Sequence, residues 1–224
     1  MLYKNEYTAL CKHAQKHPII LHVKRKGTAL LPGVIQFFSY VACTYSLYFK
    51  LRLKGNKRAF SLAFKRAKRF NVNHTACIFY SNEFRELYVF QNNKSTNCHI
   101  LPLSKYLETI DAEIRADILL DKKISQEILY EHINFLSKNI KYSIKSAIGS
   151  YSIFKKSVNE FNNLQQYCTQ SILDLYEKSC VDLEFSNYTN INKQNDKITP
   201  RELCQALYFN NKNLQGTIKV VKLQ

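Results

Sequence analysis

The chain has 224 residues, of which 46% are hydrophobic, so it can bury a core in one compact domain or in a medium domain plus a small one. These proportions exclude wholesale disorder and a fibrous protein. The formal net charge of +16 predicts a polyanionic partner, nucleic acid first and an anionic membrane second.

The positive charge is concentrated near the N-terminus. Residues 1–80 contain 15 of the 33 Lys and Arg residues but only one acid, Glu6. Twelve basic residues and no acid lie between Lys24 and Arg69. Because an ordinary solvated surface mixes both signs, we expect this segment to be a dedicated cationic surface.

The N-terminal dozen residues lack the apolar core of a secretory signal, and the seven cysteines are scattered and odd in number. We therefore expect reduced thiols and an intracellular protein, in the cytoplasm or the nucleoid. Cys11, His13 and His17, with His22 nearby, are of metal-ligand type, but no Cys-x2-Cys pair accompanies them. We expect surface histidines and a buried thiol there rather than zinc, and no cofactor.

An uncharged run of 23 residues extends from Gly27 to Phe49, long enough to span a bilayer as a helix. However, it contains Pro32-Gly33, Gln36 and many β-favouring aromatic residues, and basic clusters flank both ends. We therefore expect no membrane span, and membrane association through residues 27–49 is an open alternative.

Three strands and a helix are predicted for the acid-free segment. Residues 34–43 are rich in β-formers, and residues 47–54 alternate strictly between apolar and polar, the period of a half-buried strand. Gly55-Asn56 suits a tight hairpin turn, after which residues 57–62 would return as the third strand. The apolar residues that then recur at helical spacing are Ala63, Phe64, Ala67 and Phe70.

In this arrangement the helix covers the apolar side of the sheet, and the open cationic side fits the major groove of duplex DNA. The side chains expected to contact DNA are Tyr48, Lys50, Arg52, Lys54, Lys57, Arg58, Lys65, Arg66, Lys68 and Arg69. Residues 65–69 would mainly contact phosphates, whereas Arg52 and Arg58 are the better candidates for base contacts.

A family resemblance is carried by Gly33-Val34 at the first strand, residues 48–53 in the second, the 54–58 hairpin, and Phe60 and Ala67 where helix would pack on sheet. In residues 33–80 the chain resembles the three-stranded-sheet DNA-binding domain of plant ethylene-response factors, which also occurs in phage integrase arm-binding regions and some homing endonucleases. The resemblance implies that Tyr48, Lys50, Arg52 and Arg58 face the groove.

Two short apolar runs, 75–80 and 87–90, flank Ser81-Asn82 and predict a second hairpin, with a helical continuation as the open alternative. A helix is expected from Ser104, and a further one from Ser125 to about Asn139. The stripe that supports the first of these helices consists of Leu103, Leu107, Ile110, Ile114 and Ile118.

From Ile144 to Leu175, apolar residues recur at every third or fourth position. One unbroken helix over this pattern would be about 48 Å long and would need a partner helix, which makes residues 142–180 a candidate homodimer interface. A break at Gly149-Ser150 with an intramolecular bundle is the equal alternative.

Residues 186–198 are rich in Asn and indicate a linker, Thr199-Pro200-Arg201-Glu202 is typical of a capped helix start, and a strand is expected at the C-terminus. The predicted fold class is α+β, with an N-terminal antiparallel sheet and packed helix followed by a mainly helical C-terminal part. The expected division is a basic α+β domain at 1–103, a helical domain at 104–185, the linker at 186–198, and a short helix and strand at 199–224.

No catalytic constellation stands out. Glu113, Asp117 and Asp121 would share a helix face beside Asp111, a pattern more typical of a solvated surface than of a metal site. Cys77 lies in an apolar run and is better explained as a buried thiol than as a nucleophile. No Gly-rich phosphate loop occurs in the sequence.

We therefore expect a non-enzymatic protein that binds nucleic acid, above all duplex DNA, through a basic sheet face and helix. An RNA-binding protein is one alternative. A membrane-associated or host-directed effector that uses residues 27–49 is the other.

Overall fold

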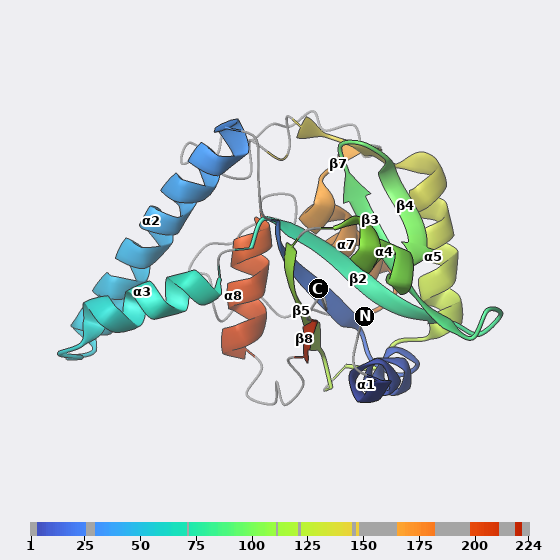
Figure 1. Cartoon of the computed structure of the whole chain (residues 1–224), viewed down its shortest axis with the longest axis horizontal. Helices are drawn as coiled ribbons and strands as arrows, with labels where there is room; N and C mark the ends of the chain where they lie inside the picture. The colour runs from blue at the N-terminus through green and yellow to red at the C-terminus, as the bar shows by residue number, and fades with distance from the viewer. Residues whose placement is uncertain are drawn as a thin grey trace.

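The computed structural model shows an α+β fold built on one six-stranded antiparallel sheet (Figure 1). It describes residues 4–25, 30–70, 72–110, 112–120, 122–144, 147, 165–181, 198–210 and 218–220. The strand order is β4-β3-β2-β1-β5-β8. These strands are β1 (Ile19–Arg25), β2 (His74–Ser81), β3 (Glu86–Asn93), β4 (Asn97–Pro102), β5 (Ala112–Ile118) and β8 (Ile218–Val220).

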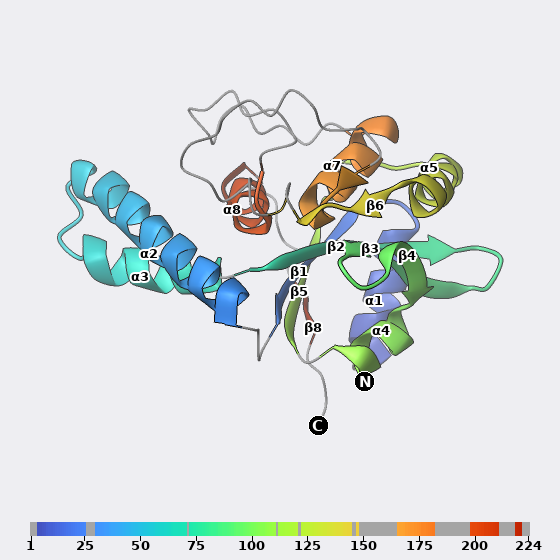
Figure 2. The same cartoon turned by 90° about the horizontal axis from the view of Figure 1, so that it is seen from above.

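Helices cover both faces of this sheet (Figure 2). The helices are α1 (Lys4–Ala14), α2 (Leu30–Leu53), α3 (Ala59–Arg69), α4 (Leu103–Thr109), α5 (Gln126–Asn139), α7 (Cys168–Lys178) and α8 (Pro200–Asn210). A parallel pair of two-residue strands, β6 (Lys141–Tyr142) and β7 (Gln165–Gln166), forms a second, minor sheet.

The two buried faces follow from the alternation of side chains along each strand. Ile20, Cys77 and Phe90 are paired across three strands and pack beneath α5, α7 and α8. Their neighbours Ile19, Ile78 and Val89 are likewise paired and pack beneath α1 and α4. A strand that is buried on both sides is almost continuously apolar, which explains the Ile-Ile-Leu-His-Val sequence of β1.

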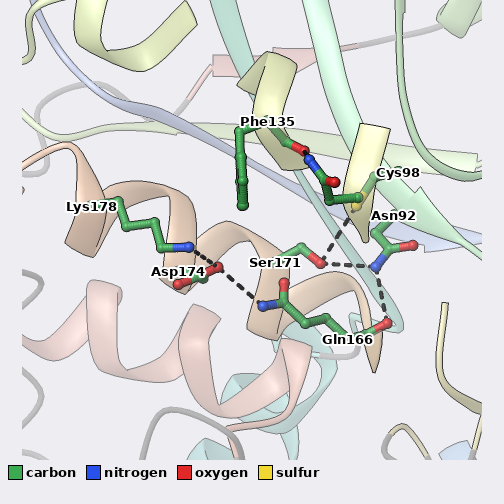
Figure 3. Close-up of polar contacts among 8 residues, drawn as sticks. Asn92, Cys98, Phe135, Gln166, Ser171, Asp174 and Lys178 are labelled. Atoms are coloured by element: carbon green, nitrogen blue, oxygen red, sulfur yellow. Dashed lines mark hydrogen bonds and ion pairs between the residues drawn. The ribbon is translucent and has the colours of Figure 1, made fainter. Parts of the chain in front are cut away.

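A polar network attaches α7 to the sheet (Figure 3). The Asn92 side-chain amide donates to the Gln166 carbonyl oxygen at 2.9 Å and to the Ser171 hydroxyl at 2.8 Å. The Gln166 amide donates to Asp174, which also pairs with Lys178 at 3.2 Å. Because Asn92 is fully buried, these bonds fix the position of α7 over β3.

Several predicted elements are confirmed. The hairpin around Ser81-Asn82 is β2–β3, the helix after Ser125 is α5, and the final strand is β8. The helix expected at Thr199 is α8, and its capping box is formed: the Thr199 backbone N–H donates to Glu202 Oε2 at 2.9 Å, and the Glu202 N–H donates to Thr199 Oγ1 at 3.2 Å.

The prediction of three strands between residues 34 and 62 is wrong, because this segment forms helix α2, a turn and the first turn of α3. The residues that carry the resemblance to the three-stranded DNA-binding domain, from Gly33-Val34 to Phe60, therefore lie on helices or in the turn between them. The alternation at residues 47–54 led to the wrong prediction because Leu47 and Leu51, four residues apart, fit both the two-residue period of a strand and one turn of a helix. These two residues are the ones that are buried here, whereas Phe49 and Leu53 are exposed.

The helix expected from Ser104 through Ile118 is also corrected, because α4 ends at Thr109 and residues 112–118 form β5. Ile114, Ala116 and Ile118 alternate with polar residues and fill the core on one face of the sheet. In this segment the two-residue period of a strand therefore determines the structure, and the helical spacing does not.

A single helix over 144–175 is excluded, because β7 at Gln165–Gln166 is extended and α7 begins at Cys168. Residues 148–164, which include Gly149-Ser150, lie outside the described residues, as do residues 186–197 of the expected linker. The boundary expected after residue 103 falls at the first residue of α4, and β5 and β8 from beyond it complete the same sheet.

Two isoleucines on α5 provide a matched test of the core. Ile133 is fully buried against the sheet, and Ile128 on the same helix is 40% exposed. We expect Ile133→Ala to lower the free energy of unfolding by about 2–5 kcal/mol and Ile128→Ala by less than about 1 kcal/mol. Urea unfolding followed by circular dichroism measures both, and equal losses would contradict the packing described here.

Candidate functional site

Helices α2 and α3 form a hairpin, residues 30–69, that projects from the sheet (Figure 1). It is inserted between β1 and β2, which are neighbours in the sheet, so the chain leaves and returns at one place. The Asn73 N–H donates to the Val23 carbonyl oxygen at 3.0 Å and joins the two ends of the insertion.

The turn of the hairpin explains why both helices end where they do. Gly55 has a φ of 75°, and its N–H donates to the Arg52 carbonyl oxygen at 2.9 Å, while the Asn56 N–H donates to that of Leu51 at 3.1 Å. This is how glycine terminates a helix. The Asn56 side chain then accepts from the Arg58 N–H at 2.9 Å and starts α3. Gly55-Asn56 therefore forms the turn of a helical hairpin, although the sequence analysis predicted that it forms the turn of a β-hairpin.

Small residues allow the two helices to pack closely. Ala59, Ala63 and Ala67 recur every fourth position on α3 and are buried, and Leu47 and Leu51 of α2 belong to the same cluster. Phe70 at the end of α3 is also buried, and Cys204 of α8 packs with it. Arg201 Nε donates to the Phe70 carbonyl oxygen at 3.2 Å, so α8 supports the base of the hairpin.

Aromatic rings line one edge of the seam between the two helices. Tyr40 and Phe64 meet edge to face with ring centroids 5.8 Å apart, and Tyr48 and Phe60 do so at 6.1 Å. We call these four residues the aromatic edge. The tyrosines are half-buried, but Phe60 and Phe64 are 62% and 50% exposed.

All ten of the predicted DNA-contacting residues lie on this hairpin, although not on one face. Lys50, Arg52, Lys54, Lys57, Arg58 and Lys65 are exposed, and Tyr48 is half-buried. On a helix, residues four apart share a side, so Tyr48 and Arg52 lie together, Lys50 lies on another side, and Lys54 follows in the turn. For Arg66, Lys68 and Arg69 the helical backbone of α3 is described and the side chains are not.

An apolar stripe of α2 side chains faces away from the seam with α3. Tyr45, Phe49 and Leu53 are one turn apart on α2 and are exposed, opposite the buried Leu47 and Leu51. Among the described residues, no helix is both long enough and apolar enough to cross a membrane.

The expectation of surface histidines is wrong for His22, which is buried in a polar group at the base of the hairpin. His22 Nε2 lies 3.1 Å from Asp117 Oδ2, and Arg115 Nε lies 3.3 Å from Asp117 Oδ1. The Arg115 guanidinium also donates to the Cys204 sulfur of α8. The one available sign was the alternation of polar residues in β5, which places Glu113, Arg115 and Asp117 on one face. This group joins β1 and β5 to α8.

A second polar chain crosses β2, β3 and β4 on the other face. The Gln91 side-chain amide lies between His74 Nε2, at 2.8 Å, and His99 Nε2, at 3.1 Å. In the part of the chain that the structure describes, no group of three or more His, Cys, Asp or Glu side chains could hold a metal ion. The expected acidic face at Glu113, Asp117 and Asp121 is not a helix face, since the first two lie on β5 and Asp121 lies outside the described residues.

Cys77, which the sequence analysis weighed as a nucleophile, and Cys98 are both buried. Burial raises the pKa of Cys77 and of Cys98 to about 12, so both are protonated at neutral pH. Cys98 contacts the Ser171 hydroxyl at 3.8 Å (Figure 3), and Cys77 lies in the core beneath α7. Neither thiol has the partly exposed, electropositive surroundings that activate a cysteine.

Comparison with known proteins returns no match, since no family model, no curated protein and no solved structure aligns significantly with this chain.

The alanine seam can be tested by overpacking. We expect Ala63→Leu to destabilise the protein by about 1–3 kcal/mol, because the added side chain would force α2 and α3 apart. Ser61→Leu, on the exposed side of α3, should change stability by less than about 0.5 kcal/mol. Thermal unfolding measures both variants, and a tolerated Ala63→Leu would show that the two helices do not pack at this position.

Thiol reactivity tests the placement of the cysteines. We expect Cys180, which is exposed, to react with a thiol reagent in the folded protein at pH 8, whereas Cys77 reacts after denaturation. The physical reason is that burial blocks access to Cys77 and raises its pKa to about 12. Peptide mass spectrometry identifies the labelled thiols, and rapid labelling of Cys77 in the native protein would contradict its position in the core.

Proposed function

We propose that this chain is a nucleic-acid-binding protein that acts through the α2–α3 hairpin, by binding rather than by catalysing a reaction. The observation that carries the proposal is the acid-free segment from Lys24 to Arg69, most of which lies on the hairpin. Six exposed cations belong to this one element: Lys50, Arg52, Lys54, Lys57, Arg58 and Lys65.

Such a surface suits the phosphate backbone of a nucleic acid. The six described cations lie on the last turn of α2, in the turn and on α3, whereas residues 30–49 of α2 carry no charge. A cluster of exposed cations attracts phosphates and releases the counterions around them. Binding should therefore weaken steeply as salt is added.

The proposed contact differs from the predicted one in its geometry. A twisted β-ribbon in the major groove is excluded, because residues 34–62 are helical apart from the turn. A helix also fits the major groove, so duplex DNA remains within the proposal, as does RNA. An intracellular location, and a homodimer through residues 142–180, also stay proposals, and light scattering of the purified chain tests the homodimer.

Association with an anionic membrane is the second candidate, and the exposed stripe of Tyr45, Phe49 and Leu53 favours it. Aromatic and aliphatic side chains beside lysine and arginine are typical of helices that lie in a membrane interface. Flotation of the protein with vesicles that contain phosphatidylserine separates this candidate from the first.

The salt dependence of binding tests the nucleic-acid proposal. We expect the double variant Lys50→Ala/Arg52→Ala to weaken binding to a labelled DNA oligonucleotide and to lower the slope of log K against log salt. The slope should fall by about 0.9 for each duplex phosphate that is no longer neutralised, or by about 0.7 for each phosphate of a single strand. Fluorescence polarisation at several salt concentrations measures it.

The matched control is Lys94→Ala/Lys105→Ala, which removes two exposed lysines from the sheet side of the molecule. This variant should keep the wild-type slope to within about half a unit. A hairpin variant that binds like the wild type would remove α2 from the proposed interface.

A further inference from the structure

We propose that the aromatic edge of the hairpin makes this protein a binder of single-stranded nucleic acid, with unpaired bases stacked on Phe60 and Phe64. This inference rests on the proposed function and specifies the class of nucleic acid. It depends on three observations: the orientation of the rings, their spacing and the charges beside them.

Each exposed phenylalanine is held in place by a half-buried tyrosine. Tyr48 supports Phe60 with an interplanar angle of 72°, and Tyr40 supports Phe64 with an angle of 80°. An edge-to-face contact covers at most one face of one ring in each pair. Because Phe60 and Phe64 remain 62% and 50% exposed, each pair leaves ring surface that a further aromatic group can stack on. The tyrosine contact holds this ring surface in place before binding.

The spacing of the two rings favours an opened strand over a duplex. Phe60 and Phe64 are four residues apart on α3, which is about 6 Å along the helix axis. Successive bases in a duplex strand are about 3.4 Å apart and their faces are covered by neighbouring bases. Two rings at nearly twice that distance can each receive a base in a strand whose bases are unstacked, as in other single-strand platforms.

The charges beside the aromatic edge complement a strand that lies along it. Lys57 and Arg58 precede Phe60 in the turn, Lys65 follows Phe64, and Arg52 is one helical turn beyond Tyr48. All four cations are exposed, and no acid lies between Lys24 and Arg69. A binder that combines a cationic track with stacking rings is expected to be tolerant of base sequence.

The test compares a single strand with a duplex and separates stacking from mere apolarity. The double variant Phe60→Leu/Phe64→Leu keeps the apolar surface and removes the rings. With a fluorescein-labelled strand of fifteen thymidines as probe, we expect this variant to raise Kd about 25-fold, because the loss of each stacked base lowers affinity about fivefold. Its affinity for a duplex of equal length should change less than about twofold.

Two further variants serve as controls. Phe84→Leu/Phe135→Leu removes rings of similar exposure from the β2–β3 turn and α5, and it should bind the thymidine strand like the wild type. Phe60→Tyr/Phe64→Tyr keeps the aromatic faces and should restore most of the affinity. Circular dichroism and thermal unfolding of each variant establish that the hairpin remains folded.

The outcomes distinguish this inference from the proposed function. A wild-type protein that binds neither strand nor duplex at low salt overturns both. Salt-dependent binding that Phe60→Leu/Phe64→Leu leaves unchanged, or weakens equally for strand and duplex, overturns the single-strand inference alone. Binding to phosphatidylserine vesicles, without binding of either the thymidine strand or the duplex, favours a membrane partner for the hairpin and overturns both.

Discussion

Twelve cationic side chains and no carboxylate lie between Lys24 and Arg69, and burying so many charges would cost far more free energy than folding supplies. This constraint shapes the molecule. The acid-free chain leaves the sheet after β1, forms two helices whose shared seam consists of alanine and leucine, and returns at β2. Most of the buried side chains described within the hairpin are short or aliphatic, and its six described cations are exposed to water. A concentrated positive field at the surface is the consequence.

The sheet is the base from which the hairpin projects. Both of its faces are covered by helices, so the strands that carry the insertion, β1 and β2, are central and buried on both sides. Helix α8 packs against the base of the hairpin through Cys204, and Arg201 donates to the end of α3. The polar group of His22, Arg115 and Asp117 lies beneath the same helix. The cationic element is thus presented from a rigid base, which favours a defined binding geometry over a loose electrostatic attraction.

The sequence predicted the fold class, the β2–β3 hairpin, helix α5 and the capped start of α8, because each of these carries a local signature such as the Thr199–Glu202 box. It also located all nine cationic residues of the hairpin, since a charge count does not depend on secondary structure. It failed on the conformation of residues 34–62. There the spacing of Leu47 and Leu51 fits both the two-residue period of a strand and one turn of a helix. The decisive fact, that Phe49 and Leu53 are exposed, is a property of the tertiary structure.

The pairing of Tyr48 with Phe60 and of Tyr40 with Phe64 could not be foreseen from the sequence, because it requires α2 and α3 to be antiparallel neighbours. The group formed by His22 and Asp117 was hidden for the same reason, as it needs the register of β1 against β5.

The central claim is that a nucleic acid contacts the projecting hairpin and not the helices that cover the sheet. Photocrosslinking of the whole chain to a bromodeoxyuridine-substituted single strand, followed by peptide mass spectrometry, tests it most directly. We predict that crosslinked peptides come from residues 37–70, with Phe60 and Phe64 among the modified positions. Crosslinks concentrated on α5, α7 or α4, with residues 37–70 unmodified, would contradict the claim.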